Sequence, residues 1–147
     1  MTVNIQQGSK QTSHDKSRIH ESYSNLEIRL ACVEDGLDNS GFRKISAYIK
    51  SIHQNTKIAY IPTSNFRNIL SQLLERIGGD LNDKDIHEVA KFMAQGDIAA
   101  FSSMTQSAFN VYKIIAEVRK LNPKSYIIWG GIHAIIEPED AIKYADA

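Results

Sequence analysis

The stretch DIAAFSSMTQSAFNVYKIIAEVRKLNPKSYIIWGGIHAIIEPEDAIKYADA, residues 97–147, decides the fold of this chain. It begins with an apolar strand at residues 98–105 that ends in hydroxyl groups, and continues into an amphipathic helix. A second apolar strand, residues 126–131, ends in paired glycines and leads into a new helix. This βαβα order predicts neighbouring parallel strands, and ligands of such open sheets bind beyond the carboxyl ends of the strands.

The same alternation of strand and helix extends toward the N-terminus. A loop rich in turn-forming residues at positions 34–41 separates the first strand from the first helix, with Ser40 placed to cap that helix. The last helix is opened by Pro138 and acidic residues. The other predicted elements are strands at residues 26–33 and 57–61 and helices at residues 42–52, 66–77, 82–94 and 108–121.

This order predicts an α/β fold: a doubly wound parallel sheet, flavodoxin-like and Rossmann-type, with strand order 2-1-3-4. The fifth edge strand expected of such a sheet is missing, because the chain stops at Ala147, where that strand would start. We therefore expect the domain at residues 26–147 to be a C-terminally truncated segment of a longer protein. Residues 1–25 are polar and have few clustered apolar side chains, which predicts a flexible tail.

Composition narrows the class of protein. A chain of 147 residues that is 42% hydrophobic can form one domain with a real core, but not two. Its 17 basic and 17 acidic residues cancel, so no field of one sign would recruit a nucleic acid or an anionic membrane. The single cysteine, Cys32, lies in an apolar run, which predicts a buried and unreactive thiol. The lack of a spanning segment or a signal peptide predicts a cytoplasmic protein.

Small and hydroxyl-bearing residues follow the third and fourth strands. Ser102, Ser103 and Thr105 could hydrogen-bond a ligand, or could simply turn the chain and satisfy its backbone groups. Gly130 and Gly131 could let a bulky planar ligand approach the backbone, or could form a plain turn. Because the two strands are expected to be neighbours, we expect both groups of residues to flank one cavity at the same end of the sheet.

Three motifs together resemble the cobalamin-binding domain at the N-terminus of cobalamin-dependent radical SAM proteins: SSMT at residues 102–105, WGGIH at 129–133 and PEDA at 138–141. ACVEDG at residues 31–36, with GFRK at 41–44, is similar to the first strand and loop of one subgroup. In that family the nucleotide tail of the cofactor lies between the sheet and its helices. The resemblance implies cobalamin as cofactor, bound by Ser102, Ser103, Met104, Thr105, Gly130, Gly131 and His133.

The resemblance also implies a partner, a radical SAM catalytic domain in cis or in trans that holds an iron–sulfur cluster and S-adenosylmethionine. This chain lacks the required Cys-x-x-x-Cys-x-x-Cys triplet, so it is not catalytic alone. Many cobalamin domains coordinate cobalt through a histidine after the first strand, but residues 35–41 contain none, which implies a different or absent lower ligand. For His133 we favour a hydrogen bond to a neighbouring loop over direct metal ligation, and we assign no metal-ligating residue.

Other functions hosted by this fold fit less well. A phosphorelay receiver would need an aspartate where the third strand ends in Ser102 and Ser103. Neither a Gly-x-Gly-x-x-Gly motif nor a P-loop follows any strand, and no Gly-x-Ser-x-Gly elbow is present. The remaining alternative is not enzymatic: a cobalamin-domain-like scaffold or interaction module that no longer binds the cofactor.

Overall fold

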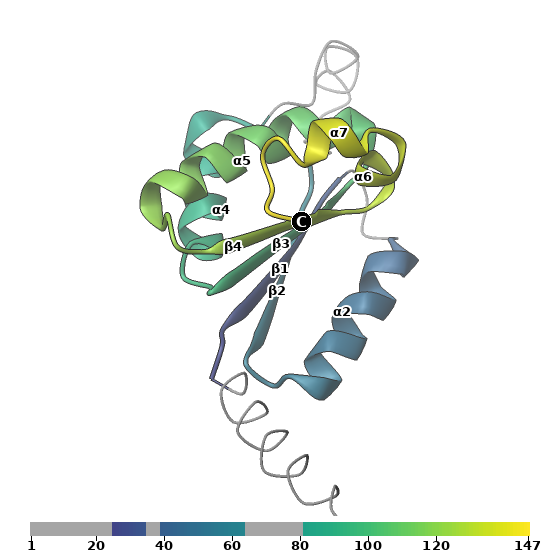
Figure 1. Cartoon of the computed structure of the whole chain (residues 1–147), viewed down its shortest axis with the longest axis vertical. Coiled ribbons are helices and arrows are strands. Elements are labelled where there is room, and N and C mark those ends of the chain that lie inside the picture. The colour runs from purple at the N-terminus through teal and green to yellow at the C-terminus, as the bar shows by residue number, and fades with distance from the viewer. Residues whose placement is uncertain (1–24, 35–38, 64–80) are drawn as a thin grey trace, which may run out of the picture.

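The computed structural model describes residues 25–34, 39–63 and 81–147. These residues form a four-stranded sheet in the order β2-β1-β3-β4, with helices on both faces (Figure 1). All three strand pairs are parallel, so the predicted doubly wound, flavodoxin-like α/β fold is confirmed. The strands are β1 (Ile28–Val33), β2 (Thr56–Ile61), β3 (Ile98–Ser103) and β4 (Tyr126–Gly130).

The helices lie on the two sides of this sheet. Helix α2 (Ser40–Ile52) packs on one face, whereas α4 (Asp83–Met93) and α5 (Ala108–Leu121) pack on the other (Figure 1). Two short helices, α6 (Ile132–Ile136) and α7 (Pro138–Ala141), follow β4 on the side of α5. The predicted helix at residues 66–77 and the predicted tail up to residue 24 lie outside the described residues.

Asparagine side chains begin two of the helices. The Asn39 side-chain oxygen accepts a hydrogen bond from the Phe42 backbone nitrogen at 2.8 Å, so Asn39 caps α2 and Ser40, the predicted cap, is the first helical residue. Asn39 lies three residues before Phe42, so its side chain satisfies the third amide of the helix, one of the amides that lack a partner within the helix. Asn82 caps α4 in the same way, with Asp85 as donor at 2.9 Å.

The ends of β3 and β4 differ from the predicted boundaries. β3 stops at Ser103 because a 3₁₀ helix, η2 (Thr105–Ser107), begins two residues later. β4 stops at Gly130, and α6 starts directly after Gly131, whose φ of 93° departs from strand geometry. The predicted last helix, opened by Pro138, is the four-residue α7, and the short α6 precedes it directly after the glycines.

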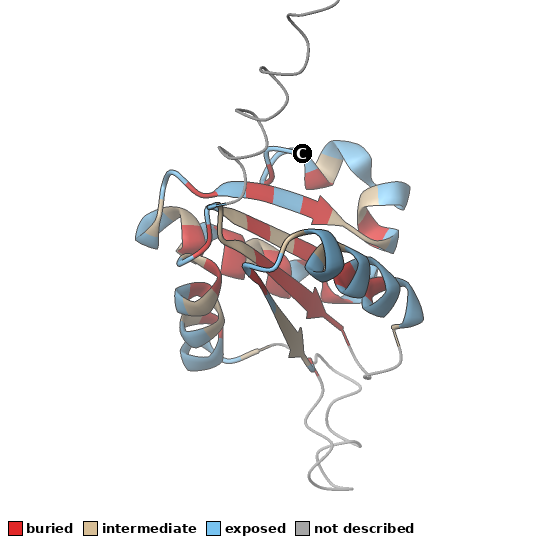
Figure 2. Ribbon diagram, turned by 90° about the horizontal axis from the view of Figure 1, so that it is seen from below, coloured by how far each residue is buried: buried red, intermediate tan, exposed pale blue. Residues whose placement is uncertain are grey.

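Two apolar clusters sandwich the sheet. The larger cluster packs alternate strand residues, among them Phe101 and Trp129, against α4 and α5. The smaller cluster joins Leu30 and Cys32 of β1 to Phe42 of α2. In Figure 2 the central strands are red, the colour of buried residues, whereas the outer side of α2 is pale blue. Burial raises the pKa of the Cys32 thiol to about 12, with a further contribution from the Glu34 carboxylate, in agreement with the predicted buried thiol.

The free edge of β4 is partly paired by the last residues of the chain. The Ala147 backbone nitrogen donates to the Ile127 oxygen at 3.2 Å, and the Ala147 oxygen accepts from the Trp129 nitrogen at 2.8 Å. In a parallel ladder, the N–H and the C=O of one residue bond to two residues of the adjacent strand that lie two positions apart, as Ala147 does here. The Asp146 carboxylate adds bonds to the Ile127 nitrogen and to Arg119, which together lower its pKa.

Within the described ranges, none of the helices combines the length and the apolar character that crossing a membrane requires.

Candidate functional site

The carboxyl ends of β3 and β4 lie side by side, as predicted, with Ser102 opposite Gly130 in the ladder. Side chains alternate between the faces of a strand. Because Phe101 and Trp129 belong to the core under α5, their neighbours Ser102 and Gly130 face the side of α2. Ala100, two residues before Ser102, packs against the α2 cluster and confirms this orientation. We call the partly buried strip formed by Ala100, Ser102 and Gly130 the strand-end surface.

The two adjacent glycines have different surroundings. A Cβ atom on Gly131 would lie 2.7 Å from the Ser103 oxygen, 2.8 Å from the Ser103 nitrogen and 2.9 Å from the Ser102 hydroxyl. Among the described residues, a Cβ atom on Gly130 would meet a single atom within 4 Å, the Phe101 oxygen at 3.9 Å. The space beside Gly131 is therefore filled by β3, whereas no described residue fills the space beside Gly130.

The residues after Ser102 divide between the interior and the surface. Ser103 is buried on the α5 side, where its hydroxyl accepts a hydrogen bond from the Trp129 indole nitrogen at 3.0 Å. Met104 and Thr105 are exposed where the chain enters η2. Of the four predicted residues in this run, Ser102, Met104 and Thr105 are accessible to a ligand, and Ser103 holds β3 to β4 from the other side.

His133 lies in a buried polar cluster on the α5 side of the sheet. Its side chain is 3% exposed, and its Nε2 atom is 3.1 Å from the Tyr112 hydroxyl. That hydroxyl donates to the Asp140 carboxylate, so its oxygen accepts from Nε2–H, which assigns the proton of His133 to Nε2. The structure thus places His133 in a hydrogen bond between helices, away from the strand-end surface.

Aromatic rings enclose this cluster. The His133 ring lies against Trp129 with centroids 4.8 Å apart, and Tyr112 meets Trp129 edge-on at 5.0 Å. Burial, followed by the hydrogen bond to Asp140, raises the pKa of Tyr112 above its ordinary value. The same hydrogen bond, assisted by Lys143, lowers the pKa of Asp140. At neutral pH Tyr112 is neutral and Asp140 is ionised, the states in which the hydroxyl donates to the carboxylate.

Tyr112→Phe is expected to lower the melting temperature by roughly 2–6 °C, because it removes the hydroxyl shared by His133 and Asp140. The folded-state pKa of Asp140 is depressed, so the stabilisation is present at neutral pH and is lost as the pH falls through that pKa. Melting curves at pH 7 and pH 3 test this: the difference between wild type and variant should shrink at pH 3. Tyr144→Phe, which removes the hydroxyl of an exposed tyrosine, is the control. An equal fall in melting temperature in both variants would contradict a stabilising role for the hydrogen bond of Tyr112.

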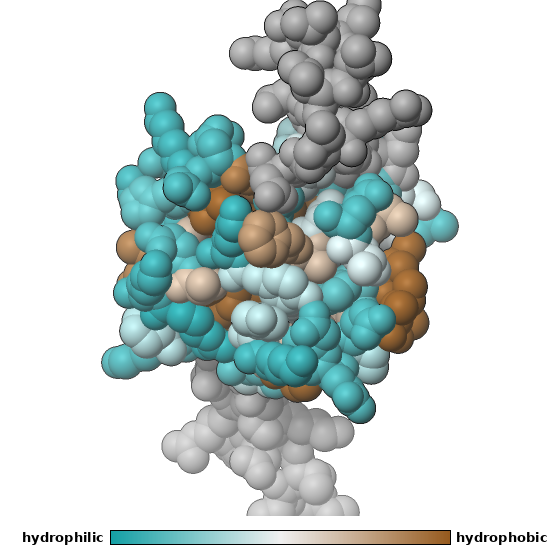
Figure 3. Space-filling model, turned by 90° about the horizontal axis from the view of Figure 1, so that it is seen from above, coloured by the Kyte–Doolittle hydropathy of each residue, from teal (hydrophilic) through white to brown (hydrophobic). Residues whose placement is uncertain are grey.

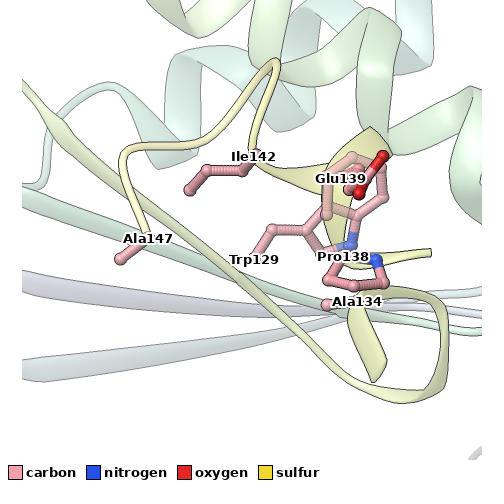
Figure 4. Close-up of a pocket in the computed structure, with 7 residues that line it drawn as sticks. Trp129, Ala134, Pro138, Glu139, Ile142 and Ala147 are labelled. Atoms are coloured by element: carbon pink, nitrogen blue, oxygen red, sulfur yellow. The ribbon is translucent and has the colours of Figure 1, made fainter. Parts of the chain in front are cut away.

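A pocket of about 400 Å³ opens beside this cluster, at the edge of β4 (Figure 4). Its walls are mostly apolar, and Glu139 is the one charged side chain among the described residues that line it. None of the seven predicted cofactor-binding residues lines it. The lining residues are Trp129, Ala134, Pro138, Glu139, Ala141, Ile142 and Ala147.

Sequence reasoning missed Tyr112 and Asp140 as partners of His133. Tyr112 lies among the apolar residues of α5 and reads as a core residue, and Asp140 reads as a favourable charge in the first turn of a helix. The contacts span 21 and 28 positions of sequence, and no local pattern links these residues. The WGGIH motif alone placed His133 near a strand end, without showing on which side of the sheet it lies.

No group of three or more histidine, cysteine, aspartate or glutamate side chains that could hold a metal ion occurs in residues 25–34, 39–63 and 81–147. Comparisons with models of protein families, with curated proteins and with solved structures found no match to this chain.

Proposed function

We propose that this domain binds cobalamin noncovalently and holds the nucleotide tail of the cofactor on the strand-end surface. The observation that carries the proposal is the space beside Gly130 that the described residues leave open, next to Ser102, at the carboxyl ends of two neighbouring parallel strands. This is where open α/β sheets bind their ligands. Such an edge suits an elongated, largely planar group that must approach the backbone closely.

The chemistry of the strand-end surface fits such a tail. Ala100 and Gly130 have minimal side chains, and the exposed Met104 adds apolar area at the open end. The Ser102 hydroxyl can donate and accept hydrogen bonds, and is available to the heteroatoms of a nucleotide. A β-branched side chain in place of Gly130, or a large side chain in place of Ser102, would fill the space that the tail needs.

A histidine ligand to cobalt is not part of this proposal. The sequence of the loop at residues 35–41 contains no histidine, and His133 is engaged with Tyr112 on the opposite side of the sheet. The protein's contribution is binding and orientation, whereas the reactivity belongs to the cofactor. When bound, cobalamin could carry a methyl group or assist a radical rearrangement. Radical SAM catalysis requires three cysteines that hold an iron–sulfur cluster, and this chain has one. A radical SAM domain in cis or in trans would therefore position the substrate.

Titration with hydroxocobalamin, followed by desalting, tests the proposal. Wild-type protein is expected to retain cofactor with a visible spectrum shifted from that of the free form. Ser102→Leu and Gly130→Val should each weaken binding by at least about tenfold, equivalent to about 1.4 kcal/mol, because both fill the slot. Ser51→Leu makes the same substitution at an exposed position of α2 and should bind like wild type.

Circular dichroism of each variant separates lost binding from lost folding. Unchanged affinity in both Ser102→Leu and Gly130→Val would reject the strand-end surface as the site. A folded wild-type protein that retains no cofactor would reject cobalamin binding and leave the interaction-module alternative.

A further inference from the structure

Residues 146 and 147 pair with β4 like the first residues of a further strand. Ala147 bonds to the backbone on both sides of Ile128, so it lies opposite that residue. Asp146 lies opposite Ile127 and directs its carboxylate to Arg119 of α5. These contacts set the direction and the register of a backbone that continues from Ala147 along β4.

The register decides to which side of the sheet the next side chain would point. Residues opposite one another in neighbouring strands share a face, and successive residues of a strand alternate between the faces. Asp146 lies on the α5 side, as its ion pair with Arg119 shows, and Figure 4 shows the Ala147 side chain directed away from Trp129. A residue joined to Ala147 would lie opposite Trp129 and point to the α5 side, where Trp129 is buried.

The pocket beside Trp129 lies where that side chain would point. Ala147 is at one end of the pocket and Ala134 and Pro138 are at the other, so the pocket extends in the direction in which β4 runs (Figure 4). An apolar cavity of roughly 150 Å³ accommodates a benzene ring, so about 400 Å³ is ample for a leucine or phenylalanine side chain. The mostly apolar walls favour such a side chain over a polar one, which would lose its hydrogen bonds to water.

The edge of β4 also offers a backbone acceptor to a continued strand. Tyr126 turns its backbone groups toward β3, so Ile127 and Trp129 turn theirs to the edge that Ala147 occupies. Among the described residues outside the helices and strands, no backbone N–H donates to the Trp129 oxygen. In a parallel ladder this oxygen would accept a hydrogen bond from the second residue after Ala147. A continued strand would therefore gain a backbone hydrogen bond and also fill the pocket.

We propose that the edge of β4 holds a fifth parallel strand, which continues from Ala147 and inserts a large apolar side chain into the pocket at its first position. A separate peptide fits less well, because β4 ends at Gly130 and leaves few backbone bonds to offset the cost of association. A segment joined to Ala147 avoids most of that cost, since the ladder already fixes where it starts.

A fifth strand would also decide where the following part of a longer chain lies. Parallel strands end at the same edge of a sheet, so this strand would end next to Gly130 and the strand-end surface. A domain that follows it would start beside the proposed cobalamin site, as a catalytic domain in cis requires. The placement of that domain rests on the proposed function, whereas the strand itself rests on the hydrogen bonds of Ala147 and on the pocket.

A short extension of the full chain after Ala147 tests the proposal. The extension Leu-Thr-Ser-Thr has leucine at the first position, which faces the pocket. Thr-Leu-Ser-Thr has the same composition, but its leucine is at the second position and faces the α2 side. We expect the first extension to raise the melting temperature by at least about 4 °C more than the second, because only its leucine is buried against Trp129. Thermal denaturation followed by circular dichroism measures this difference.

Two serine variants, each combined with both extensions, locate the buried leucine. Ile142 lines the pocket, so Ile142→Ser should remove at least about half of the difference between the extensions. Ile135 is exposed among the hydrophobic atoms at the margin of the molecule near α6 (Figure 3) and does not line the pocket. Ile135→Ser should therefore retain the difference. Equal melting temperatures of the two extended chains, or a difference that Ile142→Ser leaves intact, would overturn the proposal.

The source of the strand is tested with the same peptide added as a separate molecule. Leu-Thr-Ser-Thr with blocked ends should leave the melting temperature of the unextended chain unchanged. A shift as large as that of the joined extension would overturn the assignment to a strand in cis and indicate a separate partner. Hydroxocobalamin plays no part in these measurements, so their failure can be distinguished from a failure of cobalamin binding.

Discussion

Gly131→Ala is expected to lower the free energy of unfolding by about 3 kcal/mol, a large part of the stability of a small domain. Gly131 has φ 93° and ψ −171°, a backbone region that is essentially restricted to glycine. Its Cβ would also lie 2.7 Å from the Ser103 oxygen, a backbone atom that cannot move without shifting β3. Urea denaturation followed by circular dichroism measures this loss.

Gly130→Ala is the matched control, since it adds the same methyl group one residue earlier. Its Cβ would meet the Phe101 oxygen at an ordinary 3.9 Å, and Gly130 has no positive φ. Alanine restricts the unfolded chain more than glycine does, so Gly130→Ala should leave stability unchanged or raise it by up to about 1 kcal/mol. Equal losses in both variants would show that the two glycines do not differ as described.

Arg29→Ala is expected to cost about 3 kcal/mol of stability, because Arg29 is a buried charged residue that joins β1 to the end of α4. Its guanidinium donates to the Phe92 backbone oxygen at 2.6 Å and to the Gln95 side chain at 2.9 Å. It also pairs with Glu27 and lies over the Phe92 ring, 4.5 Å from the centroid. Removing it leaves a carbonyl at the helix end without this donor and opens a cavity beside the ring.

Lys57→Ala is the control for the ion pair itself. Lys57 also binds Glu27, at 3.2 Å, but its side chain is half exposed, and such pairs contribute about 0–1 kcal/mol. Chemical denaturation of the two variants should therefore give clearly different losses. If Arg29→Ala costs no more than Lys57→Ala, the contacts with Phe92 and Gln95 do not stabilise the fold.

The site was predictable only in part. Parallel strands end at the same edge of a sheet, so local patterns alone brought the run at residues 102–105 beside Gly130 and Gly131. The different roles of the two glycines were not predictable, because they depend on how closely β3 approaches each one. Likewise, Ser102 and Ser103 look equivalent in sequence, yet one faces the open side and the other binds Trp129 in the interior.

The sequence by itself determined the order of the described strands and helices, the parallel sheet and the burial of Cys32. These follow from hydrophobic periodicity and turn chemistry, which act between near neighbours in the chain. Only the tertiary structure decided that Tyr112, His133 and Asp140 meet. It also decided that three of the five large apolar residues of α2, namely Ile45, Tyr48 and Ile52, remain exposed. Both outcomes depend on which elements pack over which face of the sheet, and helical spacing alone does not encode that choice.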